Sequence, residues 1–382
     1  MSKGRNMQYC SLCCFAKDED FYIEEWVDYH LLLGFDKIII YDNHSIIPLK
    51  SLFKEKIEQG KVVVHETSAS DIGTKAQGKS YTHCFETYSA DFMWIGVIDA
   101  DEIILLKNHN NIKEFLCEFE NYGGIFLNWV YYANPNLDKR TTKSQITNFV
   151  YTINDDVTTI GKSIVRPNCV DEFKGPHGPR YKKNFFPVNT EHLPLDYQTY
   201  SGPICTESAQ INHYYLRTKE DFEIKKAKWL KSGLNIDISY NESIKQYTLL
   251  DKTAENNYNI LKDNKRDELD CNFNSIKDLT EFFTSIIKYK ALIPDIRILL
   301  ANSSCKFEND ALIWLLRAIL ERKNNNLQKA LYFIKQALKL SGNSLIYHEL
   351  AEIYKELGDM EHFKRAEMQF KYKKHIEDTT CE

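Results

Sequence analysis

The sequence predicts an α/β fold with a mixed, mainly parallel sheet, followed by an all-α C-terminal region. Over roughly the first hundred residues, short apolar segments alternate with segments of helical periodicity. Such strand–helix–strand repeats form right-handed crossovers, which place consecutive strands parallel in one sheet. The last part of the chain has helical periodicity without strand-like runs. A chain of 382 residues is long enough for two domains.

The N-terminal elements follow from apolar periodicity and from glycine stop signals. Strands are expected at residues 9–16, 37–41, 61–65 and 93–98, and helices at 21–33, 49–59 and 74–90. Asp18 or Asp20 is placed to cap the first helix, and Gly34 and Gly60 follow the first two helices. Ligands of such sheets bind at the carboxyl ends of the strands, so we expect the site there.

The rest of the chain divides into three parts. Residues 123–216 carry shorter strands and proline-rich loops, and a helix capped by Thr218 is expected at 219–231. Residues 235–300 are polar, rich in asparagine and partly helical. We therefore expect a sheet domain at 1–232, a helical or irregular connection at 233–304 and helical repeats at 305–376.

The C-terminal region contains a weak internal repeat with a period of about 33 residues. Its matching positions are Trp314, Ala318, Asn325, Ala330 and Ala337 in one unit, and Tyr347, Ala351, Gly358 and Phe363 in the next. This spacing is typical of tetratricopeptide (TPR) helix pairs, whose surfaces bind protein partners. An ordinary helical bundle is an equal alternative.

Composition and charge limit the function classes. The net charge of -5 gives no single-sign field, so wholesale binding to nucleic acid or to an anionic membrane is not expected. No apolar run is long enough to span a membrane, and the ten cysteines are expected to remain thiols in a cytoplasmic compartment. Peripheral contact with the inner membrane face is a further prediction, through Lys225, Lys226, Lys228 and Lys231. A solvated helix face explains these lysines more simply.

The most informative segment is the strand end at residues 93–102, which delivers three carboxylates within its last four positions. Alternation along an extended backbone would put Asp99 and Asp101 on the same side. Like charges at the end of a buried strand repel, and a hard divalent cation such as Mg²⁺ or Mn²⁺ would neutralise them. A solvated acidic turn is the alternative. Asp18 and Asp42 end two neighbouring strands, and this convergence favours a binding site.

Several short motifs occur in a fixed order along the chain. They lie at residues 16–36, at 40–45, at Gln77, Tyr81, His83 and Cys84, and at 93–102, 162–167, His177 and 211–215. Together they resemble glycosyltransferase family 92 and its bacterial relatives related to family 2. The resemblance covers about residues 8–230 and depends on the whole ordered set, because each motif alone is common.

The resemblance implies a GT-A fold, a nucleotide-sugar donor, a Mn²⁺ or Mg²⁺ cofactor and inversion at the transferred carbon. Carried over residue by residue, Asp42 would contact uracil or ribose, and Asp99 would hold the ribose or join the metal ligands. Asp101 and His213 would ligate the metal, with Glu102 as support. The first donor-binding turn would be Lys17, Asp18 and Glu19.

The same resemblance suggests further donor contacts, at Gln77, His83, Lys162, Arg166 and His177. Lys162 and Arg166 could reach the diphosphate, with surface salt bridges as the alternative. His177 lies in a rigid Gly- and Pro-rich loop. It could gate the donor or bind the acceptor, or it could be an ordinary turn residue.

An inverting transfer needs a carboxylate that takes the proton of the acceptor hydroxyl. The candidates in the second half of the sheet domain are Asp138, Asp155, Asp156, Asp171 and Glu172. Asp171 and Glu172 are preferred because they lie between residues 162–167 and His177.

The resemblance implies a metal-dependent transferase that moves a sugar from a UDP-sugar to a hydroxyl of a glycan or glycolipid. The same family resemblance makes galactose the first candidate for the sugar. The alternative from another class is a non-catalytic nucleotide-sugar or partner-binding protein, with a degenerate transferase domain and a docking tail. A two-metal phosphohydrolase would need more clustered His and Asp ligands than the sequence contains.

Overall fold

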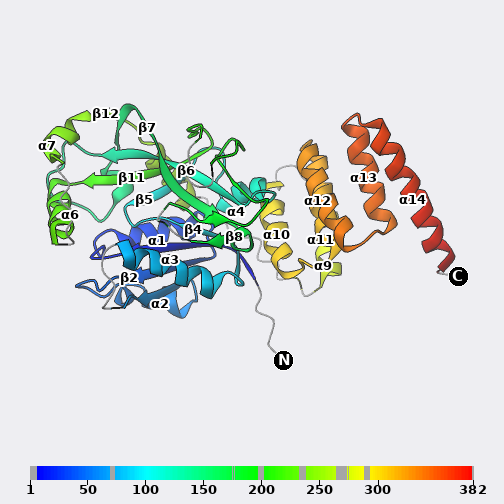
Figure 1. Ribbon diagram of the computed structural model, residues 1–382, viewed down its shortest axis with the longest axis horizontal. Coiled ribbons are helices and arrows are strands. Elements are labelled where there is room, and N and C mark those ends of the chain that lie inside the picture. Colours follow the sequence, from blue (N-terminus) through cyan, green and yellow to red (C-terminus); the bar gives the residue numbers. More distant parts are fainter. Residues whose placement is uncertain are drawn as a thin grey trace. The chain divides into compact units, whose positions relative to one another are not determined.

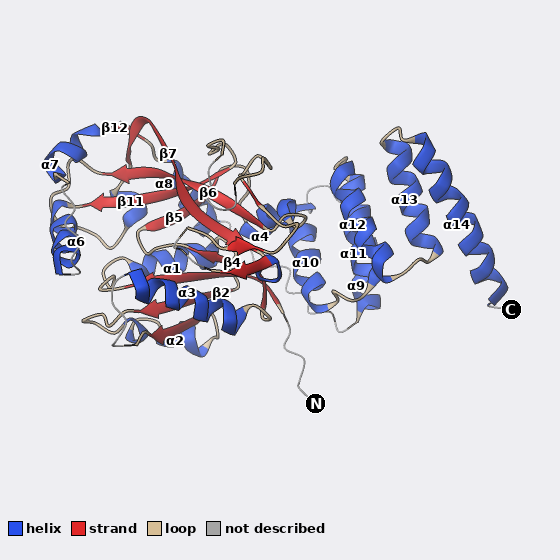
Figure 2. Ribbon diagram, in the orientation of Figure 1, coloured by secondary structure: helices blue, strands red, loops and turns tan. Residues whose placement is uncertain are grey.

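The computed structural model describes residues 7–68, 74–173, 175, 177–196, 202–231, 238–263, 273, 275–287 and 293–380. The chain forms two compact units, Met7–Arg266 and Asp267–Glu382. In the described residues, the first unit contains the strands and the second contains helices (Figure 2). The boundary expected at residues 232–233 lies outside the described residues.

The first half of the sheet is parallel. β1 (Gln8–Ala16), β2 (Lys37–Asp42), β3 (Val62–Glu66) and β4 (Phe92–Val97) lie in the order β3–β2–β1–β4. The connecting helices are α1 (Ile23–Leu32), α2 (Lys54–Glu58) and α3 (Thr74–Tyr88), labelled in Figure 1. The alternation of strands and helices predicted from the apolar periodicity is therefore confirmed.

Two details of these helices differ from the prediction. The helix expected at residues 49–59 is a 3₁₀ turn, η1 (Leu49–Ser51), followed by α2. Phe53 separates them with φ -114 and ψ 24, which is not a helical conformation. Helix α1 starts after Tyr22 without a side-chain cap. Asp18, one of the expected caps, instead accepts a hydrogen bond from the backbone N–H of Ile46 at 2.8 Å.

The second half of the sheet is mixed. β5 (Glu102–Leu106), β6 (Gly124–Ala133), β7 (Tyr151–Val165) and β11 (Ala209–Arg217) complete the order β4–β7–β6–β11–β5. β7 runs antiparallel to β4 and β6, and β11 runs parallel to β6 and antiparallel to β5. β10 (Pro187–Val188) pairs with β6, β12 (Tyr247–Leu250) pairs with β7, and β8 (Val170–Glu172) pairs separately with β9 (Arg180–Tyr181). The expected mixed, mainly parallel sheet is present.

Short helices complete the first unit. They are α4 (Ile112–Leu116), η2 (Cys117–Phe119), α5 (Gln145–Asn148), η3 (Pro167–Cys169), α6 (Lys219–Lys231), α7 (Tyr240–Ser243), η4 (Ile244–Gln246) and α8 (Thr253–Asp263). The predicted cap of α6 is confirmed, because Thr218 Oγ1 accepts a hydrogen bond from the backbone N–H of Asp221 at 3.1 Å.

The core of the first unit lies around β1 and α1. Cys10, Cys13 and Cys14 on β1 are fully buried free thiols, as expected for an inner strand. His30 on α1 is also fully buried. Its Nδ1–H donates to Trp26 O at 2.7 Å and its Nε2 accepts from the N–H of Ile104 at 3.3 Å. Burial lowers the pKa of His30 to about 3, so this ring is a neutral core residue.

The second unit is built from consecutive helices. They are α9 (Ile276–Ile286), α10 (Ile293–Lys306), α11 (Ala311–Lys323), α12 (Leu327–Leu340), α13 (Ser344–Glu356) and α14 (Met360–Thr380). Arg297 Nε and Nη2 each lie 2.9 Å from a carboxylate oxygen of Glu321, which joins α10 to α11. Among the described residues, no helix has both the length and the apolar character needed to cross a membrane.

Candidate functional site

The acidic segment forms a turn between β4 and β5. β4 ends at Val97 and β5 begins at Glu102. The N–H of Glu102 donates to Asp99 O at 3.1 Å, and the N–H of Asp99 donates to Glu102 Oε2 at 3.0 Å. Because the chain turns here, the alternation expected for an extended strand does not apply to Asp99 and Asp101. The two carboxylates meet different partners.

Asp99 is held by α3 and β7. Gln77 Nε2 and Tyr81 OH, one helical turn apart, donate to its Oδ1 at 2.9 and 3.2 Å. Lys162 Nζ donates to its Oδ2 at 2.7 Å. The Asp99 side chain is still 29% exposed. The structure therefore brings together three of the predicted donor-site residues, Gln77, Asp99 and Lys162, and leaves part of the carboxylate open.

Lys162 and Glu102 form the buried part of the turn. Lys162 Nζ also lies 3.8 Å from Glu102 Oε1, and the two side chains are 1% and 0% exposed. Burial raises the pKa of the Glu102 carboxyl well above its ordinary value, although Lys162 opposes this rise. Burial would lower the pKa of Lys162, but the carboxylates of Asp99 and Glu102 outweigh it and raise the pKa. A charged Lys162 therefore neutralises this side of the turn.

Asp101 faces β11 and α6. His213 pairs with Glu102 across β11 and β5, and its Nε2 lies 3.6 Å from Asp101 Oδ2. Lys225 Nζ donates to the same oxygen at 2.7 Å. Burial would raise the pKa of Asp101, but Lys225 and His213 outweigh it and hold that pKa well below its ordinary value. Burial lowers the pKa of His213, and the neighbouring Asp101 carboxylate opposes this shift.

Asp101, Glu102 and His213 could hold a divalent cation. One ligand atom of each lies within 4.8 Å of the others. Carboxylate oxygens and a neutral imidazole are suitable ligands for Mn²⁺. Glu102 Oε1 and His213 Nδ1 are buried and have no hydrogen-bond partner within the described part of the chain. The donor set fits the cation once Lys225 leaves Asp101, and Asp99 is not part of this group.

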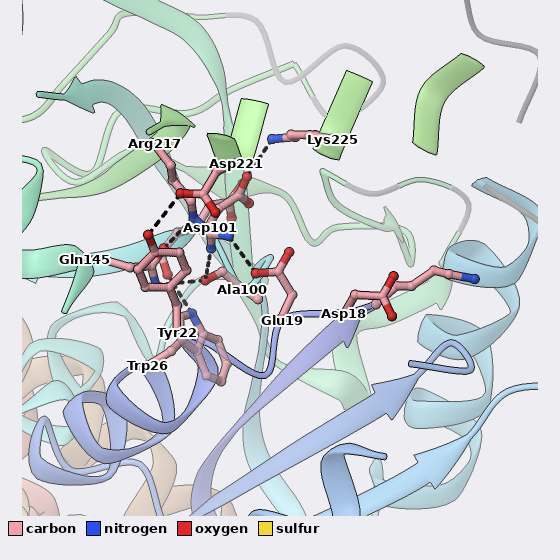
Figure 3. A network of polar contacts seen from close by, with 12 residues as sticks. Asp18, Glu19, Tyr22, Trp26, Ala100, Asp101, Gln145, Arg217, Asp221 and Lys225 are labelled. Atoms are coloured by element: carbon pink, nitrogen blue, oxygen red, sulfur yellow. Dashed lines mark hydrogen bonds and ion pairs between the residues drawn. The ribbon is translucent and has the colours of Figure 1, made fainter. Parts of the chain in front are cut away.

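The backbone of the turn is fixed from three sides (Figure 3). Gln145 Nε2 and Arg217 Nη2 both donate to Ala100 O, each at 3.1 Å. Trp26 Nε1 on α1 donates to Glu102 O at 2.6 Å. The carbonyl groups on either side of Asp101 are therefore bound, which limits how far its side chain can move.

Arg217 is the centre of this network. Its Nη1 donates to Glu19 Oε2 at 2.6 Å, and its guanidinium carbon lies 4.6 Å from the centroid of the Tyr22 ring. Tyr22 OH in turn donates to Asp221 Oδ2 at 2.9 Å. Arg217 is 8% exposed and has a positive φ of 49, a strained conformation for a non-glycine residue. Glu19, predicted for the donor turn, therefore reaches the acidic turn through Arg217.

The predicted donor-binding turn lies at the end of β1. Asp18 has a positive φ of 55, and its Oδ2 lies 3.2 Å from Lys228 Nζ. Lys228 also donates to Lys17 O at 3.0 Å, and the Lys17 side chain is exposed. Helix α6 thus contacts both regions of the predicted site, through Lys228 at the donor turn and Lys225 at the acidic turn.

Asp42 shapes the loop that follows β2. Its side chain is buried, with the residue 3% exposed. Oδ1 accepts from the N–H of Ser45 and Oδ2 accepts from the N–H of Leu49, both at 2.9 Å. Both oxygens therefore bind the chain's own backbone, and the contact with uracil or ribose stays a prediction.

His83 and Arg166 have other neighbours. His83 is exposed, and its Nδ1 lies 2.7 Å from Tyr41 OH. Arg166 Nη1 donates to Glu120 O. Arg166 directly follows β7, four residues beyond Lys162, and β7 runs antiparallel to β4 toward the amino end of that strand. The structure therefore does not bring these two predicted residues to Asp99.

His177 lies beside Trp129, a residue that the sequence pattern did not single out. His177 Nδ1 lies 2.9 Å from Gly161 O, and its ring centroid lies 5.5 Å from that of Trp129. The Trp129 ring centroid lies 4.3 Å from that of His213. Burial lowers the pKa of His177.

The preferred base candidates bind an arginine on the next strand. Arg180 Nη2 lies 2.7 Å from Asp171 Oδ2 and 3.2 Å from Glu172 Oε2, and all three side chains are about half exposed. The side chains of Asp155 and Asp156 lie outside the described residues. A role as base stays a prediction for all of these carboxylates.

Three further residues of the network escaped sequence reasoning: Gln145, Arg217 and Lys225. Their contacts with the acidic turn span 45, 117 and 124 residues of sequence, so no local periodicity marks them. Lys225 was expected only as one lysine of a basic helix face. The sole local signal is the capping pattern that begins at Thr218, directly after Arg217.

The mixed sheet, with an acidic turn after its central strand β4, is a GT-A fold. Residues 5–259 match the model of glycosyltransferase family 92, and the chain belongs to this family. It is 25% identical over 230 residues to a glycosyltransferase family 92 protein of Ricinus communis. This alignment covers 56% of the chain and 36% of the relative, so the chain spans about a third of that protein's length.

The chain also resembles solved structures at low identity. The chain is similar to residues 1–349 of S. aureus TarS, with a TM-score of 0.33 and 11% identity over 95% of this chain and 91% of that one. A second similarity is to glucosyl-3-phosphoglycerate synthase from Mycobacterium tuberculosis, with a TM-score of 0.23 and 19% identity over 32% of this chain and 44% of that one.

Proposed function

We propose that the chain transfers a sugar from a UDP-sugar to a hydroxyl group of a glycan or glycolipid, with Mn²⁺ or Mg²⁺ as cofactor. Membership of glycosyltransferase family 92 supports glycosyl transfer. The observation that carries the proposal is the grouping of Asp101, Glu102 and His213 at the end of the central strand, with ligand atoms within 4.8 Å of one another. Carboxyl ends of strands are where ligands bind in such sheets.

The residues of the turn have distinct roles in this proposal. Asp101, Glu102 and His213 would hold the cation, which stabilises the negative charge that develops on the leaving nucleoside diphosphate. Lys225 would leave Asp101 and turn toward the phosphates, where its charge is also favourable. Asp99, fixed by Lys162 and α3, would orient the ribose or the transferred sugar.

The transfer is proposed to invert the anomeric carbon. The acceptor oxygen would form its bond to that carbon as the bond to the diphosphate breaks, and a carboxylate would take the hydroxyl proton. Asp171 and Glu172 remain the candidates for this base. Both would have to release Arg180 to act. Galactose remains the first candidate for the transferred sugar, because the family resemblance suggests it.

A second candidate function is non-catalytic binding of a nucleotide-sugar or of a partner. One observation favours it: Lys162 and Lys225 already neutralise Asp99 and Asp101, each at 2.7 Å. A turn neutralised by the chain's own cations could bind a nucleotide without a metal. Such a protein would bind UDP but would not break the sugar–phosphate bond.

The C-terminal helices are proposed to be two TPR-like repeats at residues 305–376, joined to a sheet domain at 1–232 by a connection at 233–304. Asn325 and Gly358, at matching repeat positions, both have positive φ, of 62 and 76, in the turns after α11 and α13. Matching residues Ala318 and Ala351 are both buried. A protein partner for these helices, a cytoplasmic location and peripheral membrane contact are further proposals.

One experiment separates the two functions. The full chain is incubated with Mn²⁺ and a panel of UDP-sugars, and both UDP release and UDP binding are measured. Asp101→Asn should lower UDP release by at least about 100-fold, because it removes a ligand of the leaving-group cation. Asp28→Asn is the matched control, since Asp28 lies on α1 and pairs with Lys56. UDP binding without release, unchanged in Asp101→Asn, supports the binding protein. If UDP does not bind at all, both the transferase and the nucleotide-sugar-binding protein are wrong, and only binding of a partner is left of the second function.

A further inference from the structure

A row of aromatic rings lies on one face of β6 and β11, beside the acidic turn. We call Trp129 and Tyr131 of β6 with His213 and Tyr215 of β11 the aromatic platform. Tyr131 is the parallel strand partner of His213, so the side chains of the two strands point to the same face. Ring centroids lie 5.3 Å apart for Tyr131 and His213, and 5.6 Å apart for His213 and Tyr215.

The side chains of the platform are partly open. Trp129, Tyr131 and Tyr215 are only partly buried. Their sequence neighbours Tyr132 and Tyr214, which point to the other face, are 2% and 0% exposed. Aromatic residues in a closed core are normally covered on both sides. Val130, between Trp129 and Tyr131, is also only partly buried, so the opening lies at this stretch of β6 and at Tyr215.

The platform begins at the acidic turn. The register of the β6–β7 pairing shifts on both sides of Val130, and such irregularities re-aim side chains. Lys162 Nζ, which holds Asp99, lies 5.8 Å from the centroid of the Trp129 ring. His213 belongs both to the platform and to the cluster at Asp101, with Nε2 at 3.6 Å from that carboxylate. A molecule that lies on the platform would therefore have one end next to the two aspartates.

Two polar atoms at the platform are buried and have no hydrogen-bond partner in the part of the chain that the structure describes. They are Trp129 Nε1 and His213 Nδ1. Buried polar atoms normally have partners, so these two need an explanation. Flat apolar ring faces with polar atoms at their edges suit a pyranose. One face of a sugar ring presents C–H groups to an aromatic ring, while its hydroxyls form hydrogen bonds at the edge.

We propose that the aromatic platform binds the acceptor as a pyranose ring stacked on Trp129 and Tyr131. This inference rests on the proposed transferase function. The nucleoside is a less suitable occupant, because the predicted donor turn follows β1, and β4 and β7 lie between β1 and β6 in the sheet. Among the described residues, the donor turn contacts β11 at the end that follows Tyr215, where Arg217 donates to Glu19 Oε2 at 2.6 Å. This placement lets an acceptor hydroxyl approach the donor sugar from the β6–β11 side.

The test uses the full chain labelled with 5-fluorotryptophan and saturated with UDP and Mg²⁺, because paramagnetic Mn²⁺ would broaden the fluorine signal of a ring beside the metal site. Fluorine NMR follows the Trp129 resonance, which Trp129→Phe identifies by its loss. The probes are methyl β-D-galactopyranoside, methyl β-D-glucopyranoside and methyl α-D-mannopyranoside. Glucitol is the control, because it has hydroxyls but no rigid ring face. Trp314 is a matched internal control, since it lies on α11 in the other unit and its Nε1 donates to Glu308 O at 3.0 Å.

We expect at least one pyranoside to shift the Trp129 resonance, while glucitol does not and Trp314 stays unchanged. Tyr131→Leu should lower the affinity for that pyranoside by about tenfold, because the stacking contact is lost. The affinity for UDP should stay unchanged. Tyr131→Phe keeps the ring and should retain binding, which covers the case in which the leucine variant does not fold.

Three results would overturn the inference. If UDP binds but no pyranoside moves the Trp129 resonance, the platform does not bind a sugar ring, whereas the proposed function stands. If Tyr131→Leu lowers the affinity for UDP, the aromatic platform binds the nucleotide. If UDP-galactose moves the resonance and excludes the methyl glycosides, the rings hold the donor sugar. Failure of UDP to bind would instead remove the proposed function, and this inference with it.

Discussion

Lys225 Nζ and Asp101 Oδ2 lie 2.7 Å apart, so a tethered cation sits on the carboxylate that is predicted to bind the metal. The same ammonium group lies 3.3 Å from Tyr215 O and 4.3 Å from the centroid of the Tyr215 ring. A carboxylate, a carbonyl oxygen and a ring face are all partners that suit a cation. A divalent cation at Asp101 must therefore compete with Lys225 for the same oxygen.

The first prediction follows from this competition. Lys225→Met should raise the affinity for Mn²⁺ by about threefold to tenfold, because it removes a positive charge from a partly exposed site. The measurement is the free Mn²⁺ signal in electron paramagnetic resonance. Lys226→Met is the matched control, since Lys226 is the next residue on α6 and its Nζ lies 3.5 Å from Ile238 O. Equal Mn²⁺ affinities in the two variants would show that Lys225 does not compete.

The second prediction concerns the guanidinium group that holds the turn. Arg217→Met should lower the free energy of unfolding by about 3 kcal/mol, because it leaves a buried network without its cation. Urea unfolding measures this change. Arg180→Met is the comparison, as Arg180 and its partner Asp171 are about half exposed and should contribute less than about 1 kcal/mol. Similar losses in the two variants would contradict a central role for Arg217.

The third prediction concerns pH and the buried His30. Its pKa is about 3 in the folded chain, against about 6.5 when unfolded. Between these values only the unfolded chain takes up the proton, so acidification destabilises the fold. The free energy of unfolding should fall by up to about 1.4 kcal/mol per pH unit below about pH 6.5 through this residue.

The variant His30→Gln isolates that contribution, because it removes the titrating ring and keeps a polar side chain. Its unfolding free energy should depend less on pH than that of the parent chain between pH values of about 6.5 and 4.5. NMR of the His30 ring protons provides a second measurement on the parent chain. A ring that titrates near its ordinary pKa would contradict the prediction.

The fourth prediction compares two glycines. Gly161 lies where β6 and β7 approach closely, and a Cβ there would meet Leu127 O at 2.0 Å. Gly161→Ala should therefore lower the free energy of unfolding by about 2 to 3 kcal/mol. Gly78, inside α3, has no heavy atom within 4 Å of an added Cβ. Gly78→Ala should raise that free energy by up to about 1 kcal/mol, because alanine favours the helix. Thermal unfolding of both variants tests the opposite signs.

The sequence predicted the β1–β4 half of the sheet closely because local patterns define it. The helix expected at residues 74–90 is α3 (Thr74–Tyr88), and the strand expected at 37–41 is β2 (Lys37–Asp42). Apolar runs, glycine stops and turn residues are read over a few positions, and strand–helix alternation then limits the topology. The same local reasoning placed Cys10 and Cys14 in an inner strand, where they are buried.

The interior of the site could not be predicted in the same way. Asp42 has the residue type expected for a ligand contact, yet both its oxygens bind backbone N–H groups of its own loop. Lys225 was expected to be solvated, yet it pairs with a carboxylate 124 residues earlier in the chain. Such pairings depend on how distant strands and helices pack, which a single sequence does not encode in any local period.

The pairing of β5 with β11 has a consequence for how the chain is made. β5 lies at the end of the sheet, and its five residues are all buried, with β11 as its neighbour in the strand order. His213, which completes the cluster, is synthesised about one hundred residues after its strand partner Glu102. Until β11 has been synthesised, the apolar strand β5 has no strand partner on this side. The nascent chain can then form non-native strand pairs. We expect chaperones that bind extended apolar segments to bind β5 during this time.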